Sequence, residues 1–146
     1  MIPVVVDTAV AIKAVLEEPD SDRADALFEA AARGTHRLVA PELMIYEFGN
    51  VLWKQVRRAV LTEAEAKHAI ERFPFDQIEW LPGTSLLPGA FAYAIRYGLT
   101  VYDAAFLSAA TVLGVELITA DRVLHRRVAG HLPWVKLLHE LPVPWP

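Results

Sequence analysis

Short strand-like segments alternate with longer helical patterns along the whole chain. The first segment, residues 3–6 (PVVV), lacks polar–apolar alternation, which is typical of a strand buried on both faces of a parallel sheet. This alternation of strands and helices predicts βαβ units and therefore an α/β fold: a three-layer α/β/α sandwich with a mainly parallel central sheet. The further strands are expected at residues 37–40, 76–81, 116–120 and 134–138.

Capping and stop signals define the helices between these strands. Ser21 is a suitable N-cap for the second helix, and Pro41 suits the first position of the longest one. Thr62 and Glu65 form a capping box at the start of the fourth. With their caps, the helices are expected at residues 9–18, 21–33, 42–59, 62–72, 85–97, 102–113 and 121–129.

The 146 residues are expected to form one domain, residues 1–146, because neither a linker nor a repeat interrupts these patterns. The chain has no cysteine, which excludes disulfides, thiolate-bound metals and a cysteine nucleophile. Residues 1–6 lack the basic segment of a signal peptide, and the apolar stretch 104–115 is shorter than the roughly 20 residues of a membrane-spanning helix. We therefore expect a soluble, cytoplasmic protein.

Two aspartates stand where open α/β sheets concentrate chemistry, near the carboxyl ends of strands, and a third opens a helix. Asp7 directly follows the first strand, Asp121 follows the strand near residue 118, and Asp103 begins a helix. Each of them could instead serve only as a helix N-cap, which accepts hydrogen bonds from free backbone N–H groups. These positions alone leave both roles open.

Glu47 lies inside the longest predicted helix and needs a separate explanation. Leu43, Met44 and Val51 stand three or four positions away, so Glu47 points along an apolar stripe, and no Lys or Arg occupies those spacings. Burial of a lone carboxylate is costly unless another group compensates its charge. The alternative is a partly exposed position at the rim of the helix.

Convergence of the four acids would explain all of them together. Clustered carboxylates repel one another, and a divalent cation such as Mg²⁺, which prefers oxygen ligands, relieves that repulsion. The net charge of −4 argues against nucleic-acid binding by general positive charge. A bound metal would reconcile this charge with a phosphate substrate, because the metal supplies the local positive charge.

In these acids the chain resembles the PIN-domain superfamily, and within it the VapC-type ribonuclease toxins of toxin–antitoxin systems. Members carry an Asp that closes the first strand, a Glu in an E-x-x-N-V-L helix motif, an Asp that opens a mid-chain helix, and an Asp in T-x-D after a late strand. The corresponding segments here, in the same order, are VVDT (5–8), EFGNVL (47–52), YDAA (102–105) and TAD (119–121).

The resemblance implies a single PIN-like domain that hydrolyses RNA phosphodiester bonds as an endoribonuclease with Mg²⁺, or Mn²⁺, as its cofactor. The implied catalytic and metal-binding residues are Asp7, Glu47, Asp103 and Asp121. The residues implied to orient these carboxylates are Thr8, Asn50 and Thr119. Members often have Ser or Thr two residues after the first Asp, where this chain has Ala9, so either Thr8 replaces that group or one polar contact is missing.

The resemblance also implies partners: an RNA substrate, a cognate antitoxin protein and a second copy in a homodimer. A hydrophobic fraction of 54%, above the usual roughly 45–50%, is compatible with apolar surface left for such partners. The candidate RNA contacts are Lys13, Lys54, Arg57, Arg122, Arg126 and Arg127. The tryptophans at 53, 80, 134 and 145 are instead expected in the core or an interface, not as platforms for bases.

Two other functions stay open. A phosphatase-type hydrolase would use Asp7 as its nucleophile, but such enzymes usually need a second acid at the position of Ala9. A catalytically inactive PIN-like binding module would keep the fold without the activity, and a failure to bind divalent ions would favour it. The chain has no histidine spacing typical of zinc sites and no serine-hydrolase or phosphate-loop motif.

Overall fold

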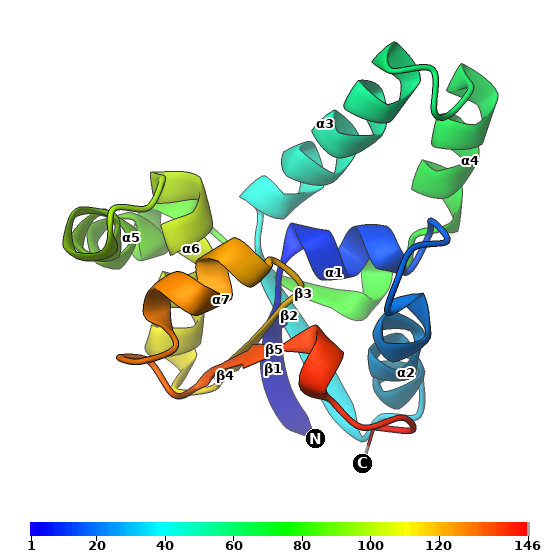
Figure 1. Ribbon diagram of the computed structural model, residues 1–146. Helices are drawn as coiled ribbons and strands as arrows, with labels where there is room; N and C mark the ends of the chain where they lie inside the picture. The colour runs from blue at the N-terminus through cyan, green and yellow to red at the C-terminus, as the bar shows by residue number, and fades with distance from the viewer. Residues whose placement is uncertain (146) are drawn as a thin grey trace.

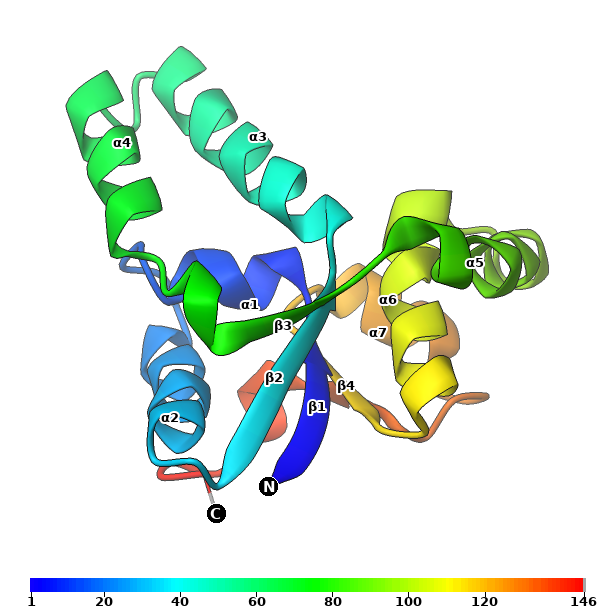
Figure 2. The same ribbon diagram turned by 180° about the vertical axis from the view of Figure 1, so that it is seen from behind.

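A five-stranded parallel sheet forms the centre of the computed structural model, which describes residues 1–145 (Figures 1 and 2). Its strand order is β3-β2-β1-β4-β5, and all four pairs of neighbours are parallel. The predicted fold class is therefore confirmed. The strands are β1 (Ile2–Val6), β2 (His36–Pro41), β3 (Ile78–Leu81), β4 (Glu116–Thr119) and β5 (Val135–Leu137).

Helices cover both faces of this sheet. Helices α1 and α2 lie on one face and α5, α6 and α7 on the other, while α3 and α4 form an arm that leads away from the sheet (Figures 1 and 2). The α-helices are α1 (Thr8–Lys13), α2 (Ser21–Ala32), α3 (Leu43–Arg57), α4 (Glu63–Arg72), α5 (Gly83–Tyr97), α6 (Val101–Leu113) and α7 (Arg122–Val128). Two 3₁₀ turns, Phe75–Gln77 and Leu138–Glu140, precede and follow edge strands. Within residues 1–145, none of the helices is both long enough and apolar enough to cross a membrane.

The core lies between the sheet and its helices. Val4 to Val6 of β1 are at most 2% exposed, as expected for a central strand covered on both faces. Phe48 of α3 packs on Phe73 with ring centroids 4.6 Å apart, and Phe73 contacts Phe28 of α2 at 5.5 Å. These aromatic contacts attach the arm to the body of the molecule.

Local capping was predicted correctly in one helix and wrongly in another. At α4 the capping box is present: the Glu65 N–H donates to Thr62 Oγ1 at 3.1 Å, and the Thr62 N–H donates to Glu65 Oε1 at 2.9 Å. At α2 the N-cap is Asp20, and Ser21 is the first helical residue. The Ser21 hydroxyl instead donates to the Leu16 carbonyl at 2.8 Å, so it stabilises the turn before the helix.

Several predicted boundaries are also wrong for reasons of tertiary structure. Pro41 does not open α3 but ends β2, where it pairs with Leu81 of β3. The first helix ends at Lys13 rather than at residue 18, because the chain turns there toward the contacts of Ser21. Helix α5 begins at Gly83, two residues before the expected start at residue 85.

Candidate active site

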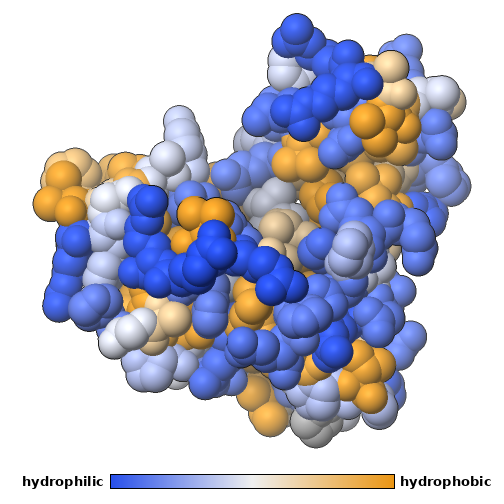
Figure 3. Space-filling view, in the orientation of Figure 1, coloured by the Kyte–Doolittle hydropathy of each residue, from blue (hydrophilic) through white to orange (hydrophobic). Residues whose placement is uncertain are grey.

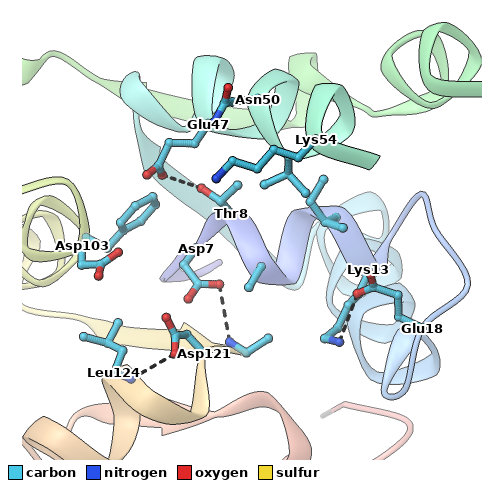
Figure 4. Close-up of a pocket in the computed structure, with 15 residues that line it drawn as sticks. Asp7, Thr8, Lys13, Glu18, Glu47, Asn50, Lys54, Asp103, Asp121 and Leu124 are labelled. Atoms are coloured by element: carbon cyan, nitrogen blue, oxygen red, sulfur yellow. Dashed lines mark hydrogen bonds and ion pairs between the residues drawn. The ribbon is translucent and has the colours of Figure 1, made fainter. Parts of the chain in front are cut away.

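The strand order changes direction between β1 and β4. The connection from β1 leads through α1 and α2 to one side of the sheet, and the connection from β4 leads through α7 to the other. Neighbouring strands whose connections diverge leave a crevice beyond their carboxyl ends, where α/β proteins commonly bind ligands. A pocket of about 390 Å³ lies there, and all four predicted acids line it (Figure 4): Asp7, Glu47, Asp103 and Asp121.

Asp7 occupies the floor of this pocket, directly after β1, and only 5% of it is exposed. Its Oδ1 accepts the Val10 N–H at 3.0 Å, so it is also the N-cap of α1. The Thr119 hydroxyl donates to Oδ2, and the Ala120 N–H approaches Oδ1 at 3.5 Å. Burial raises the pKa of Asp7 from 3.8 to about 6, although these hydrogen bonds act in the opposite direction.

Asp121 also combines capping with a position in the pocket. Its Oδ1 accepts the Val123 and Leu124 N–H groups at 2.9 and 3.0 Å, which caps α7. The capping alternative is therefore correct for Asp7 and Asp121, but it accounts for only part of their oxygen lone pairs. The charge of Asp121 also raises the pKa of Asp7.

Asp103 is different, because the N-cap of α6 is Thr100. The Thr100 hydroxyl accepts the backbone N–H of Asp103 at 3.1 Å, which leaves the carboxylate free to face the pocket (Figure 4). Partial burial raises the pKa of Asp103, and the nearby charge of Asp121 raises it further. Asp103 thus has no capping role, and its carboxylate is free to bind a ligand in the pocket.

Glu47 reaches the same pocket from the first half of α3. It is half-buried, and the Thr8 hydroxyl donates to its Oε1 at 2.7 Å. Burial raises the pKa of Glu47, and the charge of Asp103 adds to this effect. Asn50 lines the pocket one turn further along the helix, but its amide makes no hydrogen bond to a carboxylate within residues 1–145.

The donor chemistry of the pocket fits a hard divalent cation. Four carboxylates from separate segments face one cavity, and burial and mutual repulsion raise the pKa of three of them, which a bound cation would reverse. No three acidic or histidine side chains of the described part of the chain are gathered as a preformed metal-binding group. The separation of the four carboxylates is consistent with their mutual repulsion and with the hydrogen bonds that hold Glu47 and Asp121.

Two lysines border the acidic part of the pocket. Lys13 and Lys54 both line it, and Lys13 Nζ lies 3.3 Å from Glu18 Oε1, an ion pair that sequence analysis did not anticipate (Figure 4). Of the other predicted RNA contacts, Arg57, Arg122 and Arg126 are exposed outside the pocket. Arg127 donates to the Gly98 carbonyl at 2.7 Å.

The tryptophans were expected in the core or an interface, and three of them do pack on the core, whereas for Trp53 only the interface position stays a prediction. Trp80, Trp134 and Trp145 are partly buried against the core. Trp53 is 51% exposed on α3 and belongs to no core cluster of the described residues. Trp53 differs from the other three tryptophans because it lies on the side of α3 that faces solvent, and the sequence pattern alone did not reveal which side that is.

Comparison with known proteins relates this chain to a family. The model of the PIN domain family matches residues 4–130. The chain is 35% identical over 122 residues to "Ribonuclease VapC3" of Pyrobaculum aerophilum, which covers 82% of this chain and 90% of that protein. It is 32% identical over 126 residues to "Exonuclease VapC9" of the same organism, covering 81% and 92%.

Solved structures share the fold. PAE2754 from Pyrobaculum aerophilum superposes with a TM-score of 0.69 at 24% identity, over 94% of this chain and 91% of that one. A toxin–antitoxin complex from Klebsiella pneumoniae contains a chain with a TM-score of 0.61 at 18% identity, over 94% and 99%. At these identities the likeness concerns the fold alone.

Proposed function

Because this chain belongs to the PIN domain family, we propose that it is a VapC-type ribonuclease toxin that cuts RNA with the help of Mg²⁺ or Mn²⁺. One observation carries the proposal. Four acids from separate parts of the chain line one pocket beyond the carboxyl ends of β1 and β4, where the strand order reverses. One of them, Asp103, has no capping role. The related protein named a ribonuclease supports RNA as the substrate.

The side chains of the pocket have distinct tasks in this proposal. A divalent cation held by the four acids would lower the pKa of a bound water and stabilise the charge of the leaving oxygen. Thr119 holds the carboxylate of Asp7, and Thr8 holds that of Glu47, so both acids keep a fixed orientation. Lys13 and Lys54 offer positive charge to the phosphates on either side of the scissile bond.

The alternative phosphatase lacks a necessary group. Ala9 lines the pocket at the position where that chemistry needs a second acid, and an alanine supplies no proton donor or acceptor. The pocket therefore suits hydrolysis through a cation better than a covalent intermediate on Asp7.

The first experiment is cleavage of a mixed single-stranded RNA pool by the purified protein with Mg²⁺, with Mn²⁺ and with EDTA. We expect cleavage only with a metal, and loss of cleavage in Asp7→Asn and in Asp103→Asn with the fold retained. Asp76→Asn, at an exposed aspartate outside the pocket, is the matched control and should cut normally. Full activity in both pocket variants would contradict the proposed site. If no condition gives cleavage, calorimetry with Mn²⁺ decides between two cases: binding of the ion indicates a nuclease with a selective substrate, and no binding indicates an inactive binding module.

We further propose that the enzyme cuts within the chain, as an endoribonuclease. One relative bears the name of an exonuclease, so the two modes need a direct comparison. A circular RNA has no ends, and only an endonuclease can open it. Linear products from a circular substrate are therefore expected, whereas cleavage of linear RNA alone would indicate an exonuclease.

The proposed partners are a cognate antitoxin protein and a second copy of this chain. The Klebsiella pneumoniae chain with the same fold comes from a toxin–antitoxin complex, which supports the first. Exposed apolar residues on α5 support the second: Leu87, Phe91 and Ile95 are 56%, 59% and 72% exposed and follow one another at helical spacing.

A further inference from the structure

A second hollow, of about 320 Å³, adjoins the acidic pocket on the outer half of α3. Its lining consists of Trp53, Lys54, Arg57 and Arg58, and Lys54 lines both cavities. The guanidinium of Arg57 lies 4.9 Å from the centre of the Trp53 ring, a cation–π contact that holds the indole on the surface. We name these four residues the α3 platform.

The α3 platform continues a stripe that begins at the acids. Glu47, Asn50, Lys54 and Arg57 follow one another by three or four residues, so they share one side of the helix. From Glu47 to Arg57 the helix rises about 15 Å. Since α3 leads away from the sheet, the stripe leads outward from the pocket (Figure 1).

The α3 platform carries three positive charges close together, and none of them is in an ion pair with a described residue. Among residues 1–145, Lys54, Arg57 and Arg58 form no ion pair, although the whole chain has a net charge of −4. Positive charge near the end of α3 is favourable for the helix dipole, which accounts for part of this pattern. The helix dipole does not account for a tryptophan that is 51% exposed among these cations. Basic side chains around an accessible aromatic ring are the combination that binds single-stranded nucleic acid.

We propose that the α3 platform binds the single-stranded RNA segment beside the scissile phosphate, with a base stacked on Trp53 and the phosphates on the cations. The inference rests on the proposed ribonuclease function and adds to it a substrate subsite and a direction for the strand, outward along α3. Lys54 also lines the acidic pocket, but Trp53, Arg57 and Arg58 lie outside it and take no part in the chemistry at the acids. These three residues therefore affect the binding of RNA rather than the rate of the bound complex.

Binding is measured by fluorescence anisotropy of a labelled oligouridylate on protein that carries Asp7→Asn, so that the RNA stays intact. Adding Trp53→Ala should raise Kd about 10-fold, and Trp53→Tyr should recover most of the affinity because it restores an aromatic face. Replacing Arg57 and Arg58 by Gln should flatten the salt dependence of binding, by about 0.7 in the logarithmic slope for each lost phosphate contact. Arg33→Gln is the control, since it removes one exposed charge at the turn before β2, away from α3.

Two further readouts report stacking and separate this inference from the proposed function. RNA should quench the tryptophan fluorescence of the parent protein, and Trp53→Phe should remove that quenching. In the active protein, Trp53→Ala should raise KM with little change in kcat.

If the active protein cuts RNA while Trp53→Ala leaves Kd and KM unchanged, the proposed RNA subsite on the α3 platform is contradicted, whereas the proposed ribonuclease function is not. If the variant weakens the binding of a protein partner and not of RNA, the platform is a protein contact. If nothing cuts RNA, the proposed function fails, and the anisotropy still decides whether the platform binds it.

Discussion

Two threonines hold two of the four acids in place. Thr8 donates to Glu47 and Thr119 donates to Asp7, so each acid presents its remaining lone pairs to the pocket. Ala9 supplies no hydroxyl, and Thr8 is the residue that makes a hydrogen bond on this side of the pocket. At the scale of single residues, the precision of the site therefore depends on these two hydroxyl groups.

Replacement of Thr8 by Val removes the hydroxyl while it keeps the branched shape of the side chain. We expect cleavage to fall about 10- to 100-fold, because Glu47 loses the group that orients it. The free energy of unfolding should change by about 1 kcal/mol or less. The comparison is kcat/KM with urea denaturation of the same samples, and Thr84→Val, at an exposed threonine of α5, is the control. Equal cleavage by Thr8→Val and the unsubstituted protein would show that this contact has no role.

Burial of Asp7 predicts a pH dependence of stability in the metal-free protein. The folded chain holds the proton of Asp7 up to about pH 6, whereas the unfolded chain releases it near 3.8. The stabilisation from protonated Asp7 is thus fully present below pH 3.8 and is lost as the pH rises through about 6, a change of about 3 kcal/mol. In EDTA, the urea midpoint of the unsubstituted protein should fall over this range more than that of Asp7→Asn. Parallel curves for the two proteins would contradict the raised pKa.

Close packing of α5 on α6 depends on one glycine. A Cβ on Gly89 would lie 2.6 Å from Ser108 Oγ, and that hydroxyl donates to the Leu86 carbonyl at 2.8 Å. The next atom, Ser108 Cβ, would lie at an ordinary 3.5 Å. The two helices therefore approach through a serine that fits only against a glycine.

Gly89→Ala should consequently destabilise the protein by about 1–2 kcal/mol, although alanine is the better helix former. Combination with Ser108→Ala should recover much of that loss, because the second change removes the clashing oxygen at the cost of one hydrogen bond. A double-mutant cycle from urea denaturation measures the coupling. Additive effects of the two substitutions would mean that the helices adjust and that the contact is not limiting.

The helices and strands also show how far the sequence could predict the fold. The capping box of Thr62 was predictable because all its groups lie within four residues. The start of α3 was not, because the Glu42 N–H donates to the Leu81 carbonyl at 3.0 Å, a partner 39 positions away. Local chemistry thus fixes the cap of α4, whereas pairing between distant strands decides where Pro41 belongs.

The same division applies to the site. The strand ends were enough to select Asp7 and Asp121, since parallel strands bring their carboxyl ends to one edge, and the family motifs selected Glu47 and Asp103. They were not enough to show that Thr100 rather than Asp103 caps α6, or that Trp53 faces solvent. The Thr100 cap is a local contact over three residues that neither strand ends nor motif order include, whereas the exposure of Trp53 depends on the rotation of α3 against its neighbours, which periodicity alone leaves undetermined.

At the scale of the whole molecule, each chain contains all four acids of its own pocket, so a second copy is not needed to complete the site. The apolar strip on α5 lies on the outer side of the molecule, at the left edge in Figure 3, away from the α3–α4 arm. Its residues are Leu87, Phe91 and Ile95. A surface of this kind usually belongs to an interface between proteins.

We therefore expect a homodimer that forms through α5 and whose dissociation leaves RNA cleavage intact. Substitution of Phe91 and Ile95 by Glu places charges in the strip and should convert the dimer to a monomer in sedimentation and light scattering. Val60→Glu, at a residue 65% exposed on the α3–α4 arm, should remain dimeric. A monomeric unsubstituted protein, or a dimer that survives both glutamates, would exclude this interface. Loss of cleavage by the monomer would instead mean that RNA contacts both copies, because no acid of the pocket lies on α5.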